Sequence, residues 1–116
     1  MSEITAYYGG ETIEVDEEGF LIDATQWNIK MVSDIADTVD ITMSEKHWEV
    51  VEYIRHYFES NHAVPELRFF LRHLREKYGK EAATRKYVYR LFPYGYGQQM
   101  CKIAGMRKPR KLMLDV

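Results

Sequence analysis

The 116-residue sequence contains a single cysteine, three prolines and no long apolar run. One cysteine cannot form an internal disulfide, which favours a reducing cytoplasm. No apolar stretch approaches the roughly 20 residues that a membrane span requires. The first residues, Met1-Ser2-Glu3-Ile4, lack the basic and apolar regions of a signal peptide. These absences predict a soluble cytoplasmic protein that does not associate with a membrane.

The usual signatures of enzymes and metal sites are also missing. The four histidines share no metal-binding spacing, and one cysteine excludes the common structural zinc sites. No carboxylate pair, phosphate-binding loop or Ser/His/Asp arrangement stands out. No metal or cofactor is therefore expected, and the sequence alone gives no case for catalytic activity. His47, directly before Trp48, is expected to pack in the fold or to cap a helix.

The charge of the chain is divided very unevenly. Residues 1–60 contain 3 Lys/Arg and 14 Asp/Glu, a net charge of −11, whereas residues 61–116 contain 13 and 4, a net charge of +9. One interpretation is that the two halves attract each other within the fold. The other is that the second half presents a basic face to an acidic partner.

The sequence pattern predicts a mainly α-helical fold in one domain. Gly9-Gly10, between alternating β-formers, indicates a hairpin within residues 1–22. Apolar spacing predicts a helical core over residues 27–105. Residues 106–116 have no period and are expected to form a mobile C-terminal arm. The predicted helices cover about 27–38, 45–61, 65–78, 84–92 and 96–104.

Local signals place the ends of these helices. Ser44 is a favourable N-cap, Pro65 suits a first turn, and Gly79 suits a C-cap. Pro93 requires the preceding helix to stop. The aromatic residues expected to contribute most to the core are Trp27, Trp48, Phe58, Phe70 and Phe92.

Cys101 can be interpreted in two ways. Its neighbour Lys102 and the basic residues downstream would favour a thiolate, so that the thiol could act as a nucleophile or carry sulfur. A cysteine within a helix is, however, more often a small buried hydrophobe. Its place near the C-terminal end of a predicted helix also disfavours the thiolate.

A second basic group lies on the two predicted helices before this segment. Two such helices joined by a short turn could form a helix-turn-helix that binds DNA. The alternative is a solvated cationic face, which an overall acidic chain with an isoelectric point near 6.1 favours. The residues of this group are Arg68, Arg72, Arg75, Arg85 and Lys86.

Several sequence blocks, taken in order, resemble the DsrC/TusE family, which comprises the gamma subunit of dissimilatory sulfite reductase and related sulfur-relay proteins. The resemblance covers nearly the whole chain. The blocks are Asp16-Glu17-Glu18-Gly19-Phe20, Gln26-Trp27, Glu45-Lys46-His47-Trp48-Glu49-Val50-Val51, Tyr87-Val88-Tyr89-Arg90-Leu91-Phe92-Pro93, Cys101-Lys102-Ile103-Ala104-Gly105 and Lys108-Pro109.

The resemblance implies a cytoplasmic helical protein whose C-terminal arm bears two cysteines in full members. Cys101 matches the first of them. The second, which carries sulfur or enters the partner's active site, would lie eleven positions later and next to the end. Leu112 stands eleven positions after Cys101, and Asp115 is the penultimate residue of this sequence. The two-thiol and terminal-thiol chemistry of the family therefore does not carry over.

The sequence thus predicts a protein of sulfur metabolism that acts by binding. It could bind as an accessory protein or as a regulator that competes for the partner's site. Its expected partners are sulfite-reductase or sulfur-transferase subunits. A sulfur carrier that uses Cys101 and a DNA-binding regulator are the alternatives. The residues expected to contact the partner are Arg90, Lys102, Arg107, Lys108, Arg110 and Lys111.

Overall fold

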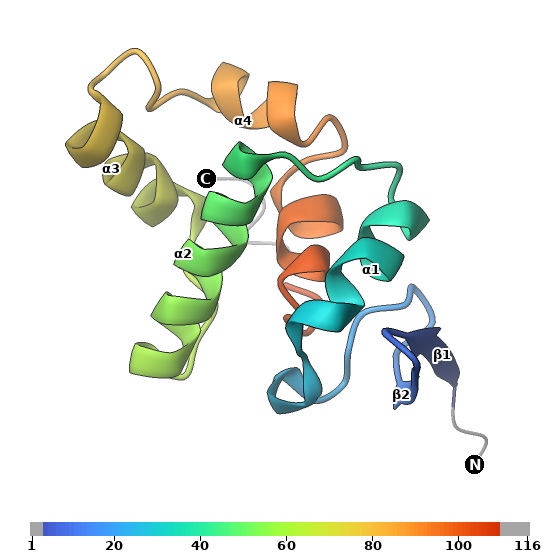
Figure 1. Ribbon diagram of the computed structural model, residues 1–116. Coiled ribbons are helices and arrows are strands. Elements are labelled where there is room, and N and C mark those ends of the chain that lie inside the picture. The colour runs from blue at the N-terminus through green and yellow to red at the C-terminus, as the bar shows by residue number, and fades with distance from the viewer. Residues whose placement is uncertain (1–3, 110–116) are drawn as a thin grey trace.

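The computed structural model describes residues 4–109, in which a hairpin precedes a set of helices (Figure 1). Strands β1 (Thr5–Tyr8) and β2 (Glu11–Glu14) pair antiparallel, with Tyr8 opposite Glu11. Gly9 and Gly10 both have positive φ, as a two-residue turn between such strands requires. The mainly helical fold with an N-terminal hairpin is therefore confirmed. The helices are α1 (Val32–Thr38), α2 (Glu45–Asn61), α3 (Leu67–Tyr78) and α4 (Arg85–Leu91).

The segment before α1 differs from the single helix predicted for residues 27–38. Two short 3₁₀ turns, Ala24–Gln26 and Ile29–Met31, come first, and α1 begins only at Val32. The Asn28 side chain accepts a hydrogen bond from the Lys30 amide and so starts the second turn there. Trp27 is left with extended backbone between the two turns.

Helix α2 has the bounds that its capping residues predict. The Ser44 backbone N–H donates to His47 Nδ1 at 3.1 Å, and the Ser44 side chain takes part in the same capping box. His47 Nε2 lies 2.8 Å from the Leu91 carbonyl oxygen, so that nitrogen carries the proton. His47 therefore both caps α2 and joins it to the end of α4.

The next two helices follow their local signals with one shift. Helix α3 begins at Leu67, two residues after Pro65, and ends before Gly79, which has a φ of 90°. The Thr84 side chain accepts from the Tyr87 amide and caps α4. The last helical segment is π-helical over Tyr96–Cys101 and continues for one turn.

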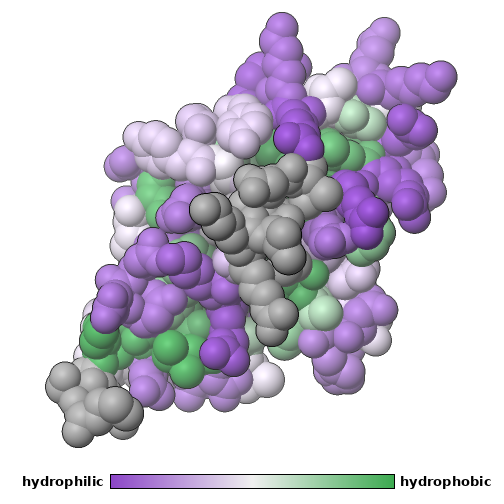
Figure 2. All heavy atoms as spheres, turned by 180° about the vertical axis from the view of Figure 1, so that it is seen from behind, coloured by the Kyte–Doolittle hydropathy of each residue, from purple (hydrophilic) through white to green (hydrophobic). Residues whose placement is uncertain are grey.

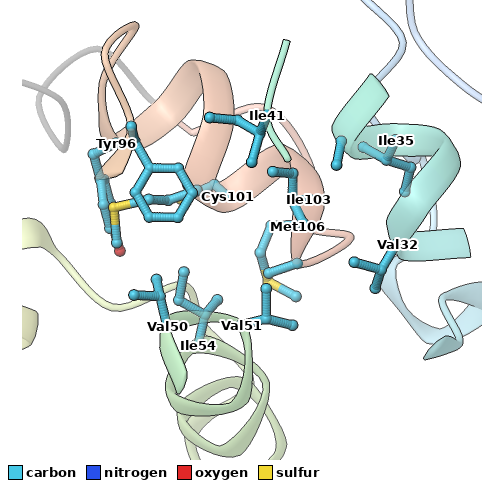
Figure 3. Close-up of a cluster of buried hydrophobic side chains, with 14 of the residues drawn as sticks. Val32, Ile35, Ile41, Val50, Val51, Ile54, Tyr96, Cys101, Ile103 and Met106 are labelled. Atoms are coloured by element: carbon cyan, nitrogen blue, oxygen red, sulfur yellow. The ribbon is translucent and has the colours of Figure 1, made fainter. Parts of the chain in front are cut away.

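The last segment forms the centre of the core. It lies between α1 and α2 in Figure 1, and Figure 3 shows Tyr96, Cys101, Ile103 and Met106 facing side chains of both helices. Phe70 and Phe92 are buried as predicted. Trp27, Trp48 and Phe58 are only half-buried and pack against the core, so the prediction that they would contribute most to it was wrong. Phe20, which was not among the predicted core aromatics, is fully buried.

The surface is largely polar. On the face shown in Figure 2, hydrophilic side chains cover most of the area and apolar residues appear between them. Within residues 4–109 one ion pair joins the acidic and basic halves of the chain, between Lys108 and Glu18. The other two pairs, Lys46–Glu49 and Arg68–Glu66, each lie within one half. Direct pairing between the halves therefore neutralises few of the cations in this part of the chain.

Candidate functional site

The Cys101 thiol is completely buried at the end of the π-helical segment. Burial raises its pKa to about 12, and the neighbouring Tyr96 hydroxyl only partly opposes that shift. A thiol with a pKa this high stays protonated at neutral pH. In this conformation Cys101 is thus a buried core residue with a protonated thiol.

Two polar side chains fix the π-helical segment that holds Cys101. The buried Tyr96 hydroxyl donates to the Pro65 carbonyl oxygen, which ties the segment to the entrance of α3. The Gln99 side chain accepts from the Tyr94 amide and donates to the Val39 carbonyl oxygen, each at 2.7 Å. π-Helical turns are rare and often occur at functional sites. Both polar groups are satisfied inside the protein, so neither is left free for a ligand.

The block Cys101-Lys102-Ile103-Ala104-Gly105 ends its helix in a Schellman motif. The Met106 amide donates to the Cys101 carbonyl oxygen at 3.0 Å, and the Gly105 amide donates to that of Lys102 at 3.0 Å. Gly105 has a φ of 77°, and a Cβ there would lie only 2.2 Å from the Trp27 ring. The glycine is therefore required both by the backbone conformation and by the contact with Trp27.

Trp27 and Arg55 hold the outside of the same turn. Trp27 Nε1 donates to the Ile103 carbonyl oxygen at 3.0 Å. The Arg55 guanidinium donates to the carbonyl oxygens of Ala24 and Ala104, each at 3.1 Å, and its centre lies 4.6 Å from the Trp27 ring. The start of the C-terminal segment is thus fixed by side chains from two other parts of the fold.

Lys102 differs from the other basic residues predicted to contact a partner, because only 8% of it is exposed. Its ammonium lies 5.6 Å from the Phe20 ring, against the turn at residues 16–20. Burial lowers its pKa, and the nearby Asp16 and Glu18 act in the opposite direction. In the described conformation Lys102 holds this turn and is not available to a partner.

The first residues of the predicted arm divide into buried and exposed positions. Met106 and Pro109 are buried, and Met106 belongs to the core. Arg107 and Lys108 are exposed, and Lys108 pairs with Glu18. Arg90, at the end of α4, is also exposed. Arg110, Lys111 and the rest of the predicted arm lie outside the described residues.

The second basic group is exposed on α3 and α4. Arg68 and Arg72 lie over the Phe69 ring, at 4.9 and 5.6 Å from its centre, and Arg68 also pairs with Glu66. Arg75, Arg85 and Lys86 are exposed as well. These contacts fit a solvated cationic face, and nothing found for this chain supports the helix-turn-helix alternative.

Within residues 4–109, no group of three His, Cys, Asp or Glu side chains is arranged to hold a metal ion. No helix among these residues is long and apolar enough to cross a membrane.

The sequence motif predicted the importance of Cys101 and Gly105, but not the polar side chains that hold the segment around them. Tyr96, Gln99 and Arg55 carry no signal of their own, since their partners are backbone carbonyl oxygens distant in sequence. The Cys101 motif could have been extended to Met106, because a Schellman motif places an apolar residue directly after its glycine.

Known proteins match this chain in both sequence and fold. Residues 7–113 match the family model described as DsrC like protein. The sulfurtransferase TusE of Escherichia coli strain K12 is 38% identical over 104 residues, which are 90% of this chain and 95% of that protein. The sulfurtransferase TusE of Pectobacterium atrosepticum is 36% identical over the same shares of the two chains.

Solved structures extend the similarity to the fold. The solution structure of DsrC from Allochromatium vinosum superposes with a TM-score of 0.81 at 33% identity, covering 94% of this chain and 97% of that one. The oxidized gamma subunit of dissimilatory sulfite reductase from Archaeoglobus fulgidus gives 0.77 at 28% identity, covering 92% and 97%. Sequence and fold agree along nearly the whole chain, and this protein belongs to the DsrC-like family.

Proposed function

We propose that this protein acts in cytoplasmic sulfur metabolism by binding a sulfite-reductase or sulfur-transferase partner, without carrying sulfur itself. Family membership supports the choice of partner, since the similar proteins are named as TusE sulfurtransferases and as the gamma subunit of dissimilatory sulfite reductase. The absence of a carrier thiol at position 112 supports binding over transfer. A protein that occupies the partner's site without chemistry would regulate it.

The state of Cys101 is the observation that carries this proposal. It is the one cysteine in the sequence, it is fully buried, and burial raises its pKa to about 12. Leu112 occupies the position at which the family's second thiol is expected. Sulfur transfer needs an accessible thiolate, and the protein in this conformation offers none.

The surface proposed to contact the partner is basic. Arg90, Arg107 and Lys108 are exposed near the end of the described chain, and Arg110 and Lys111 follow them in sequence. Charges of one sign on a rim raise the association rate with an oppositely charged surface. The partner's docking surface is accordingly proposed to be acidic.

A pull-down from the lysate of the source organism, with captured proteins identified by mass spectrometry, tests this function. Native protein and Cys101→Ala should capture the same sulfite-reductase or sulfur-transferase subunits. Arg107→Glu should capture them more weakly, whereas the matched control Arg85→Glu, exposed on α4, should not differ from native protein. Loss of these subunits in a folded Cys101→Ala variant would contradict the proposal.

A further inference from the structure

A second candidate surface is formed by residues of the acidic half of the chain. A cleft of about 190 Å³ opens between α2 and the 3₁₀ turns before α1, two parts of the fold that can be located in Figure 1. Both tryptophans of the sequence line it. The complete lining is Trp27, Ile29, Trp48, Val51, Glu52, Arg55, His56 and Glu59.

The cleft has an apolar floor and an apolar lip. Val51 is buried, Trp27 and Trp48 are half-buried, and Ile29 on the lip is 66% exposed. An exposed isoleucine beside two partly exposed tryptophans leaves apolar surface in contact with water. Patches of this kind often mark sites of protein interaction, and tryptophan is enriched among the residues that dominate binding energy.

The floor of the cleft is held in place before any ligand arrives. The Trp27 ring is fixed by its bond to the Ile103 carbonyl oxygen and by its contact with Gly105. The Arg55 guanidinium lies over that ring while its Nη1 donates to the carbonyl oxygens of Ala24 and Ala104. A site whose side chains are already ordered loses less conformational entropy on binding.

The charge around the cleft selects the occupant. Glu52 and Glu59 are exposed on its rim, whereas the one cation of the lining, Arg55, lies half-buried against the Trp27 ring, so the carboxylates outnumber it at the surface. All lining residues belong to the half of the chain with a net charge of −11. An acidic or anionic ligand would therefore be repelled, whereas Lys or Arg next to an apolar side chain would be attracted.

We infer that this cleft binds a partner-protein segment in which an apolar side chain is flanked by Lys or Arg. The apolar side chain contacts Trp27, Trp48 and Ile29, and the cations lie near Glu52 and Glu59. None of the proposed basic docking residues lines this cleft, and the inference does not depend on the proposed sulfur function.

Tryptophan fluorescence of the full chain measures occupancy directly, because both tryptophans line the cleft. The probe is a capped hexapeptide of two central leucines with two lysines on each side, which has no tryptophan of its own. Saturable change of the emission is expected at low salt, with weaker binding at high salt. A peptide with glutamates in place of the lysines, and one with serines in place of the leucines, should bind at least tenfold more weakly.

Variants locate the binding. Ile29→Ser should weaken binding of the lysine–leucine peptide about tenfold. The double variant Glu52→Lys, Glu59→Lys should weaken it about fivefold. Glu14→Lys, an exposed change in the same acidic half but outside the cleft, should have no effect. All four positions are exposed, and circular dichroism checks that each variant is folded.

Three results would overturn the inference. They are no saturable emission change up to millimolar peptide, equal binding of the glutamate peptide, and binding that Ile29→Ser leaves unchanged. Sedimentation of the free protein provides a further test. A dimer that Ile29→Ser dissociates would show that a second copy of this chain covers the cleft, which would contradict a heterologous partner.

Discussion

Three residues of the Cys101–Gly105 block are each held by a specific neighbour in the fold. The Cys101 sulfur is buried beside Tyr96, Gly105 is packed against Trp27, and Lys102 lies over the turn that contains Gly19. This block is one of those that resemble known relatives. It therefore encodes packing around the last helical segment at least as much as chemistry.

The raised pKa of Cys101 predicts a pH dependence of stability. The thiol has a pKa of about 12 in the folded state, against 9.0 as its ordinary value. Below pH 9 both states are protonated and the free energy of unfolding does not depend on this group. Above pH 9 the unfolded state loses the proton first, so the stability falls by up to about 1.4 kcal/mol per pH unit. Native protein should show this extra slope relative to Cys101→Ala.

Urea titrations between pH 8 and 10.5 measure the difference between these two proteins. The half-buried Tyr53 also has a raised pKa, which does not depend on Cys101 and so affects both proteins alike. The pKa of Tyr96 is raised mainly by burial and further by Cys101, so part of the difference between the two profiles reports the Tyr96–Cys101 contact. Parallel pH profiles would mean that Cys101 is accessible to solvent in the folded protein.

Gly105 gives a prediction about packing. Gly105→Ala should reduce the free energy of unfolding by about 2–5 kcal/mol, because it combines an unfavourable positive φ with a clash against Trp27. Gly10→Ala is the matched control, since its φ is also positive but nothing lies within 4 Å of the added Cβ. It should cost only about 1–2 kcal/mol. Equal losses in chemical denaturation would rule out the Trp27 contact as the cause.

At the scale of elements, some helices are fixed by residues close to them in the sequence, and others by residues that are close only in the fold. Ser44 and Thr84 cap α2 and α4 through residues three positions away, which is why the sequence predicts where these helices begin. The π-helical segment could not be predicted in the same way. Its hydrogen bonds lead to Pro65 and Val39, which are close to it only in the folded protein.

His47 connects two of these elements. His47→Ala should lose the imidazole's half of the α2 capping box, which accepts from the Ser44 N–H, and the bond to the Leu91 carbonyl oxygen, at a cost of about 1–3 kcal/mol. His56→Ala, an exposed change on the same helix, should alter stability by less than about 0.5 kcal/mol. Thermal and urea unfolding of both variants compare the two. A loss below 0.5 kcal/mol for His47→Ala would show that the connection contributes nothing.

At the scale of the whole molecule, two surfaces of opposite character can be distinguished. The exposed Arg90, Arg107 and Lys108 form the proposed basic docking surface, and the cleft at Trp27 and Trp48 lies in the acidic half. The uneven charge of the sequence suggested the first surface, which stays a proposal. It could not predict the second, because the cleft exists only when residues 27–29 pack beside α2. The burial of Cys101 likewise depends on the complete fold, although the position of its motif was evident from the sequence.

Persulfide loading tests most directly the central claim that this protein binds without carrying sulfur. The native protein is incubated with a persulfide donor, and its intact mass is measured. A parallel sample unfolded in urea shows that the donor can reach an exposed Cys101. The native protein is predicted to gain no transferable sulfur, while the unfolded sample gains the mass of one sulfur atom. Stoichiometric uptake by the native protein, absent in Cys101→Ser and passed on to an acceptor thiol, would contradict the account.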